Sequence, residues 1–91
     1  MKSIVQFGEN ECFLCGRQTQ LEKHHIMAGS NRKLSERYGI WCMLCASCHR
    51  GVDGAQYNAD KGKMLKQIAQ KAFEEKYSHE FWIEIFRKNY L

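Results

Sequence analysis

The sequence predicts a small α+β domain built around a metal centre, with helices at its C-terminal end. Three observations lead to this prediction: two Cys-x-x-Cys pairs, two short strand-like segments between them, and an apolar period of three to four residues in the last third of the chain. With 91 residues, the chain has room for one domain, residues 1–91. We expect a metal-bearing part at about residues 10–58 and a helical part at about residues 60–91.

The first predicted elements are two strands followed by a short helix. Residues 21–27 and 39–44 carry the aliphatic and aromatic side chains that are typical of strands. The polar run at residues 29–33 between them predicts that they form a β-hairpin. Residues 48–53 are expected to form a helix, which Gly51 would keep short because glycine disfavours helix interiors.

Two helices are predicted in the last third of the chain. One apolar face recurs at helical spacing, made of Met64, Leu65, Ile68, Ala69, Ala72, Phe73 and Tyr77. Asp60 is a candidate cap for the start of this helix, and Ser78 is a good N-cap for a second, shorter one. An aromatic stripe follows Ser78, made of Phe81, Trp82, Ile85 and Phe86. The sequence leaves open whether these helices pack on the metal-bearing part or pair with a second copy of the chain.

Composition narrows the cellular setting and the partners. The N-terminal residues 1–7 lack the apolar stretch of a secretory signal, and no segment approaches the roughly 20 apolar residues of a membrane span. We therefore expect a cytoplasmic protein with no membrane partner. The formal net charge of +4 favours a polyanionic partner, although an ordinary charged surface would give the same value.

The cysteines are spaced like zinc ligands. Cys12-x-x-Cys15 and Cys45-x-x-Cys48 each place two thiolates on a tight turn, and two such turns close a tetrahedral structural zinc site. In a reducing compartment, paired turns of this kind favour metal ligation over disulfides. Cys42-x-x-Cys45 has the same spacing and would release Cys48 instead, but the apolar neighbours of Cys42 favour a buried strand position.

Three of the four histidines are tied to this cysteine frame. His24 and His25 are adjacent on a predicted strand, so their side chains should point to opposite faces. One ring can then face a metal while the other faces a water molecule. His49 directly follows Cys48, so the zinc turn that fixes the cysteine also fixes the direction of this histidine.

At this point the chain resembles the HNH, or ββα-metal, endonuclease superfamily, and specifically its small zinc-bound members found in phages and prophages. The matching residues are Cys12-x-x-Cys15, His24-His25-Ile26 and Leu44-Cys45-x-x-Cys48-His49. Residues 31–39 and 69–77 also look like one phage-associated subgroup. The resemblance covers most of the chain and implies a zinc-bound ββα-metal domain with C-terminal helices.

The resemblance also implies an activity and a role for each histidine. The activity is metal-dependent hydrolysis of phosphodiester bonds in DNA, leaving a 3′-hydroxyl and a 5′-phosphate. His25 would be the general base, and His24 and His49 would hold a catalytic divalent cation (Mg²⁺, Mn²⁺, Ni²⁺ or Zn²⁺) distinct from the structural zinc. Histidine suits the base because it titrates near neutral pH, and a bound cation can polarise the phosphate.

Two positions depart from the family pattern. The middle asparagine of the family usually falls close before the second cysteine pair, whereas Asn31 is the only asparagine between His25 and Cys45. Asn31 is either a substitute or an ordinary turn residue. A further ligand histidine usually follows the position of His49, and here Asp53 and Gln56 are the nearby oxygen donors. Asp53 would share the face of His49 if the helix continues, and a surface carboxylate is the alternative.

Four basic residues flank these elements and are candidates for binding phosphates: Arg32, Lys33, Arg37 and Arg50. Each of them alone is an ordinary surface charge. Two other functions stay open. One alternative to the nuclease is a catalytically degenerate zinc module that binds nucleic acid or protein. The other is a structural component of a phage particle. In the last case the aromatic C-terminal stripe would meet a phage protein or a second copy in a homodimer.

Overall fold

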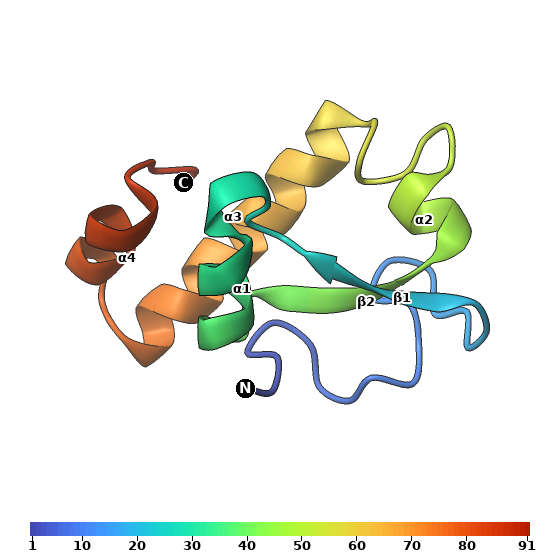
Figure 1. Cartoon of the computed structure of the whole chain (residues 1–91), viewed down its shortest axis with the longest axis horizontal. Helices are drawn as coiled ribbons and strands as arrows, with labels where there is room; N and C mark the ends of the chain where they lie inside the picture. The colour runs from blue at the N-terminus through green and yellow to red at the C-terminus, as the bar shows by residue number, and fades with distance from the viewer.

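Two antiparallel strands lie at the centre of the fold, with helices on both sides of them (Figure 1). The computed structural model describes residues 1–91. Its elements are, in order, β1 (Leu21–His25), the 3₁₀ turn η1 (Gly29–Asn31), α1 (Arg32–Tyr38), β2 (Trp41–Cys45), α2 (Ala46–Arg50), α3 (Ala59–Lys76) and α4 (His79–Phe86). The α+β class predicted from the sequence is confirmed. None of the helices has both the length and the apolar character that crossing a membrane requires.

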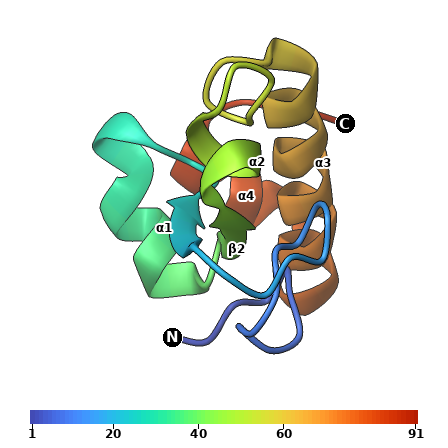
Figure 2. The same ribbon diagram turned by 90° about the vertical axis from the view of Figure 1, so that its right-hand side faces the viewer.

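Both predicted strands are present, and they pair in one register. β1 and β2 run antiparallel, with Leu21 opposite Cys45 and His25 opposite Trp41. Four of the five residues of β2 are buried. This follows from its position, because Figure 2 shows α1 on one side of the strands and α3 on the other.

The segment between the strands is not the predicted hairpin turn, because it contains η1 and the helix α1. Ser35 on α1 is fully buried, and its hydroxyl bonds both the N–H and the C=O of Met27 just after β1. α1 ends at Gly39, which has a positive φ of 71° that glycine adopts without strain. A side chain at residue 39 would also collide with the carbonyl oxygen of Lys2.

α2 begins directly after β2, two residues earlier than predicted. It spans Ala46–Arg50 rather than residues 48–53, and Cys45 is both the last residue of β2 and the N-cap of α2. The chain then turns back on the helix, with backbone hydrogen bonds from Ala55 to Cys48 and from Gln56 to His49. This turn brings Gln56 beside the helix that carries His49.

The two C-terminal helices form as predicted, with one change of cap. Ser78 caps α4 by accepting a hydrogen bond from the N–H of Phe81, as expected. The cap of α3 is Asn58, whose side chain accepts from the N–H of Lys61, whereas Asp60 lies inside the first turn. An acidic residue there still favours the helix through its dipole.

α3 and α4 pack against the cysteine-bearing part of the chain, which is the first of the two arrangements that the sequence left open. Phe73 and Trp82 share a buried core with Ile40 and Leu44, and all four are inaccessible to solvent. The aromatic stripe of α4 therefore covers the strands through α3. Burial of these large side chains is the main source of stability for a domain of this size.

Candidate functional site

Four cysteines meet where the N-terminal loop crosses the corner between β2 and α2. The Sγ atoms of Cys12, Cys15, Cys45 and Cys48 all lie within 4.8 Å of one another. The Cys15 and Cys45 sulfurs are 3.7 Å apart, close to the about 3.8 Å expected between thiolates bound tetrahedrally at about 2.3 Å from zinc. The predicted cluster is confirmed, and its donors fit a zinc ion.

Short backbone hydrogen bonds hold the first cysteine pair in place. Cys12 donates to the carbonyl of Arg17, and Gly16 donates back to the carbonyl of Cys12. Phe13 donates to the carbonyl of Met43, which fastens this turn to β2. The second pair needs no such loop, because the first turn of α2 presents both of its cysteines on one side.

The charges of the cluster also fit a bound cation. Burial favours the neutral Cys12 thiol, but backbone hydrogen bonds, the strongest from Cys45, lower its pKa to about 6. Burial and the neighbouring thiols raise the pKa of Cys48 to about 12. Four thiolates at this separation repel one another, so a divalent cation is needed to hold all four deprotonated.

Cys42 lies outside this cluster. It is fully buried in β2, opposite His24, and burial raises its pKa to about 12. The structure therefore separates the two spacings that the sequence left open, because the pair that closes the four-thiol cluster is Cys45 with Cys48. Cys42 serves as a small apolar core residue.

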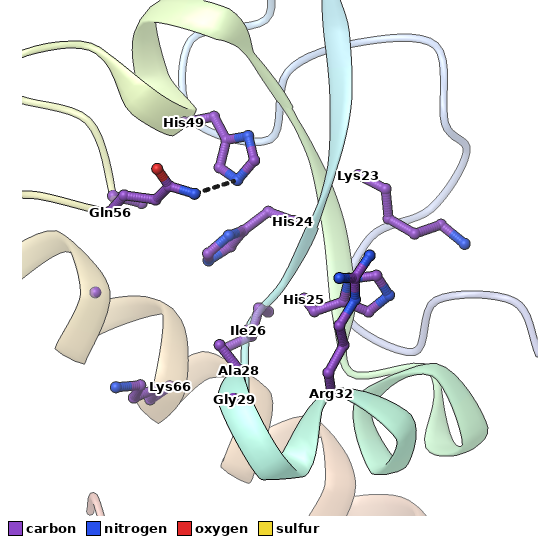
Figure 3. A pocket seen from close by; sticks show the side chains of 12 residues that line it. Lys23, His24, His25, Ile26, Ala28, Gly29, Arg32, His49, Gln56 and Lys66 are labelled. Atoms are coloured by element: carbon purple, nitrogen blue, oxygen red, sulfur yellow. Dashed lines mark hydrogen bonds between the residues drawn. The ribbon is translucent and has the colours of Figure 1, made fainter.

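His24 and His49 come together from β1 and α2. Their ring centroids are 5.0 Å apart and the rings meet edge to face (Figure 3). Burial, with a smaller contribution from His49, lowers the pKa of His24 to about 4. His24 is therefore a neutral imidazole at physiological pH, which is the form that binds metals.

A carboxylate fixes the tautomer of His49. The Nδ1 atom of His49 lies 2.8 Å from an Oε1 atom of Glu22, so Nδ1 donates and Nε2 keeps its lone pair. Arg50 holds the same carboxylate through two nitrogens, and hydrogen bonds from Arg50 and His49 lower the pKa of Glu22 to about 2. Carboxylate support of this kind is typical of metal-binding histidines.

His25 points to the other side of β1, as expected for its alternate position (Figure 3). Its Nε2 atom lies 2.6 Å from an Oε2 atom of Glu36 on α1. Lys23 bonds the other oxygen of Glu36 at 3.0 Å, and the hydrogen bonds from Lys23 and His25 lower the pKa of Glu36. This hydrogen bond holds the ring of His25, and its Nδ1 atom has no hydrogen-bond partner within the chain.

The three histidines line one open pocket of about 460 Å³. Its cationic and imidazole side chains come from Lys23, His24, His25, Arg32, His49 and Lys66. None of its lining residues is acidic, so the pocket attracts anions.

Only one of the four basic residues singled out from the sequence lines this pocket, namely Arg32. Arg50 instead pairs with Glu22, while Lys33 and Arg37 lie on α1 and do not line the pocket. Arg37 lies over the ring of Tyr38. Lys23 and Lys66 contribute the positive charges that the sequence reading missed.

Asn31 and Asp53 lie outside the pocket. Asn31 is the N-cap of α1, without a capping hydrogen bond from its side chain. α2 ends at Arg50, so the helical face that would have joined Asp53 to His49 does not continue, and Asp53 is exposed. Gln56 rather than Asp53 lies beside His49, with its amide nitrogen 3.5 Å from Nε2 of His49.

Comparison of the chain with protein-family models, with curated proteins and with solved structures gives no match. Its function is therefore inferred from the geometry of its own residues.

Proposed function

We propose that this chain is a metal-dependent endonuclease of the HNH type, which hydrolyses phosphodiester bonds in DNA. The observation that carries this proposal is the grouping of His24, His25 and His49 in one basic pocket beside a four-cysteine cluster. In this proposal β1, β2 and α2 form the ββα-metal unit, with α1 inserted between the strands. The cysteine cluster holds a structural zinc ion that fixes α2.

His24 and His49 are the protein ligands for the catalytic cation. Burial lowers the pKa of His24, so its ring is neutral, and the hydrogen bond from Nδ1 of His49 to Glu22 leaves Nε2 of His49 to face the cation. A divalent cation bound there, such as Mg²⁺, Mn²⁺, Ni²⁺ or Zn²⁺, would polarise the phosphate and stabilise the leaving oxygen. The chain offers no third ligand there, so solvent or substrate oxygens would have to supply the remaining ligands.

His25 acts as the general base in this proposal. Its Nδ1 atom takes a proton from the attacking water, while Glu36 holds Nε2 and stabilises the imidazolium that forms. Glu36 thereby fills the orienting role that the family resemblance gives to an asparagine. Asn31 does not line the pocket, although its neighbour Arg32 does, and it is not needed for this role.

Arg32 and Lys66 bind and orient the phosphate groups in this pocket. Arg32 forms no ion pair with a carboxylate, so its guanidinium is available for a bidentate phosphate contact. Lys66 approaches from α3, on the side of the pocket away from His25 (Figure 3). Two cations on opposite sides of the histidines position the scissile phosphate between them.

A second candidate function is a catalytically silent zinc module that binds nucleic acid. One observation favours it: the four cysteines are the only preformed group of three or more metal-binding side chains. His24 and His49 form a pair without a third protein ligand. The basic pocket would then bind phosphates without cleaving them.

The deciding experiment is a plasmid-nicking assay with zinc-loaded protein and added Mg²⁺, Mn²⁺ or Ni²⁺. We expect nicking that needs the added metal and is lost in His25→Ala. The matched control is His79→Ala, because His79 is half exposed at the start of α4 and pairs only with Glu74. Metal-dependent nicking that survives in His25→Ala would refute the assigned base, and DNA binding without nicking would favour the silent module.

A further inference from the structure

A second cavity adjoins the histidine pocket along the N-terminal part of α3. It has a volume of about 690 Å³ and lies between the turn before α3, the helix itself and the C-terminal residues 88–91. Ala55, Gln56, Gly62 and Lys66 line both this cavity and the histidine pocket. The two hollows therefore form one continuous groove that leads away from His24 and His49.

The second cavity carries positive charge from three lysines, and the C-terminal residue Leu91 also lines it. Lys63, Lys66 and Lys88 line it, no acidic side chain does, and none of the three forms an ion pair. The ammonium groups of Lys66 and Lys88 lie 5.5 and 5.3 Å from the ring centre of Tyr90, which holds them at the cavity wall. Three lysines around one cavity suit a ligand with more than one anionic group.

An exposed aromatic ring lies in the same cavity. Tyr57, in the turn that precedes α3, is 71% exposed. A flat aromatic ring beside cations is the usual platform for an unpaired nucleobase.

Gly62 keeps the passage between the two hollows open. Glycine inside a helix is less favourable than alanine, and a Cβ here would meet only the carbonyl oxygen of Ala55, at 3.4 Å. The helix itself therefore does not need a glycine at this position. A longer side chain would project into the junction that both cavities share.

We propose that this second cavity binds a single-stranded segment of nucleic acid next to the phosphate held by the histidines. Lys63, Lys66 and Lys88 contact its phosphates, and Tyr57 stacks on one base. This inference rests on the proposed function, since it extends the substrate beyond the scissile phosphate. Because stacking on a lone ring requires an unstacked base, the groove selects a single strand over a duplex.

The test measures binding of a labelled oligothymidine of about 12 nucleotides, within the range of known single-strand sites, at several salt concentrations. All proteins carry His25→Ala, so that cleavage does not compete. Exchanging both Lys63→Ala and Lys88→Ala should lower the slope of log K against log salt by about 1.4, which is two contacts at about 0.7 each. The matched control is the double variant Lys71→Ala and Lys76→Ala, which removes the same charge outside both cavities.

The aromatic contact is tested on the same oligonucleotide. Tyr57→Ala should weaken binding about tenfold, and Tyr57→Phe should restore it because the ring is kept. The proposal would be overturned if the two double lysine variants gave equal slopes. It would also be overturned if duplex bound more tightly than single strand whether or not Tyr57 is present. Nicking by the parent protein is measured separately. If the parent does not nick DNA but the lysine variants still change the salt slope, only the proposed nuclease activity is rejected.

Discussion

The ring of His24 lies edge to face with the ring of His49, with centroids 5.0 Å apart, although one belongs to β1 and the other to α2. Their approach depends on the corner at Cys45, where the strand ends and the helix begins. The four-cysteine cluster and the histidine pair are thus linked through one turn of α2, which carries both Cys48 and His49.

Removing a cysteine of the cluster should abolish zinc binding, whereas removing Cys42 should not. We expect Cys48→Ser to purify without zinc and to unfold at a lower temperature, because the metal-binding energy is part of the folding energy. Cys42→Ala should retain one zinc ion per chain and show only the modest destabilisation of a small core cavity. Metal content and thermal unfolding measure both, and a zinc-free Cys42→Ala would show that the wrong pair was assigned.

Glu22 should control the affinity of the histidine pair for a divalent cation. Glu22→Ala removes the acceptor of the His49 Nδ1 proton, so Ni²⁺ or Mn²⁺ should bind about 10 to 100-fold more weakly. Calorimetric titration of zinc-loaded protein measures this. Glu84→Ala, an exposed carboxylate on α4, is the control and should bind as the parent does. Unchanged affinity in Glu22→Ala would separate Glu22 from the metal site.

Glu36 should act as a positioning residue for His25. In Glu36→Ala the ring loses its 2.6 Å contact, and nicking should slow by about 10 to 100-fold through kcat, since orientation contributes on this scale. Glu36→Gln keeps an acceptor and should recover part of the rate. Glu75→Ala, exposed on α3, controls for lost charge. A change in KM alone would argue against positioning.

Ser35 should matter for stability because it joins α1 to the end of β1. Ser35→Ala leaves the N–H and C=O of Met27 buried without their partner, which costs about 1 to 3 kcal/mol. The urea midpoint should fall while the m-value is unchanged. Ser30→Ala, on the exposed turn before α1, should stay within about 0.5 kcal/mol of the parent. Equal effects of the two changes would contradict the structural role of Ser35.

The sequence predicted those features that short spacings determine. Two Cys-x-x-Cys turns fix a four-thiol cluster, adjacent His24 and His25 on a strand must diverge, and Ser78 caps the helix that follows it. The strand alternation and the cap depend on a few neighbouring residues alone. The cluster joins two pairs about 30 residues apart, and each pair is itself a local turn whose spacing is visible in the sequence.

The features that escaped prediction depend on contacts between distant segments. α1 is only seven residues long, and the residue it buries is the polar Ser35, which bonds Met27. The polar run at its start therefore has the composition of a turn. Glu36 meets His25 only because α1 exists. The role of Glu22 could have been anticipated, because residues two apart on a strand share a face and Glu22 lies two residues before His24.

Phe73 and Trp82 close the same core as Ile40 and Leu44. A fragment ending before α3 would keep every cysteine of the cluster and all three pocket histidines, yet it would expose the apolar face of β2 to water. The cysteine cluster and the histidine pocket therefore do not form a portable module. Grafting them onto another scaffold would require an equivalent of α3, and a truncation ending before α3 would test the loss of the core rather than the role of the pocket.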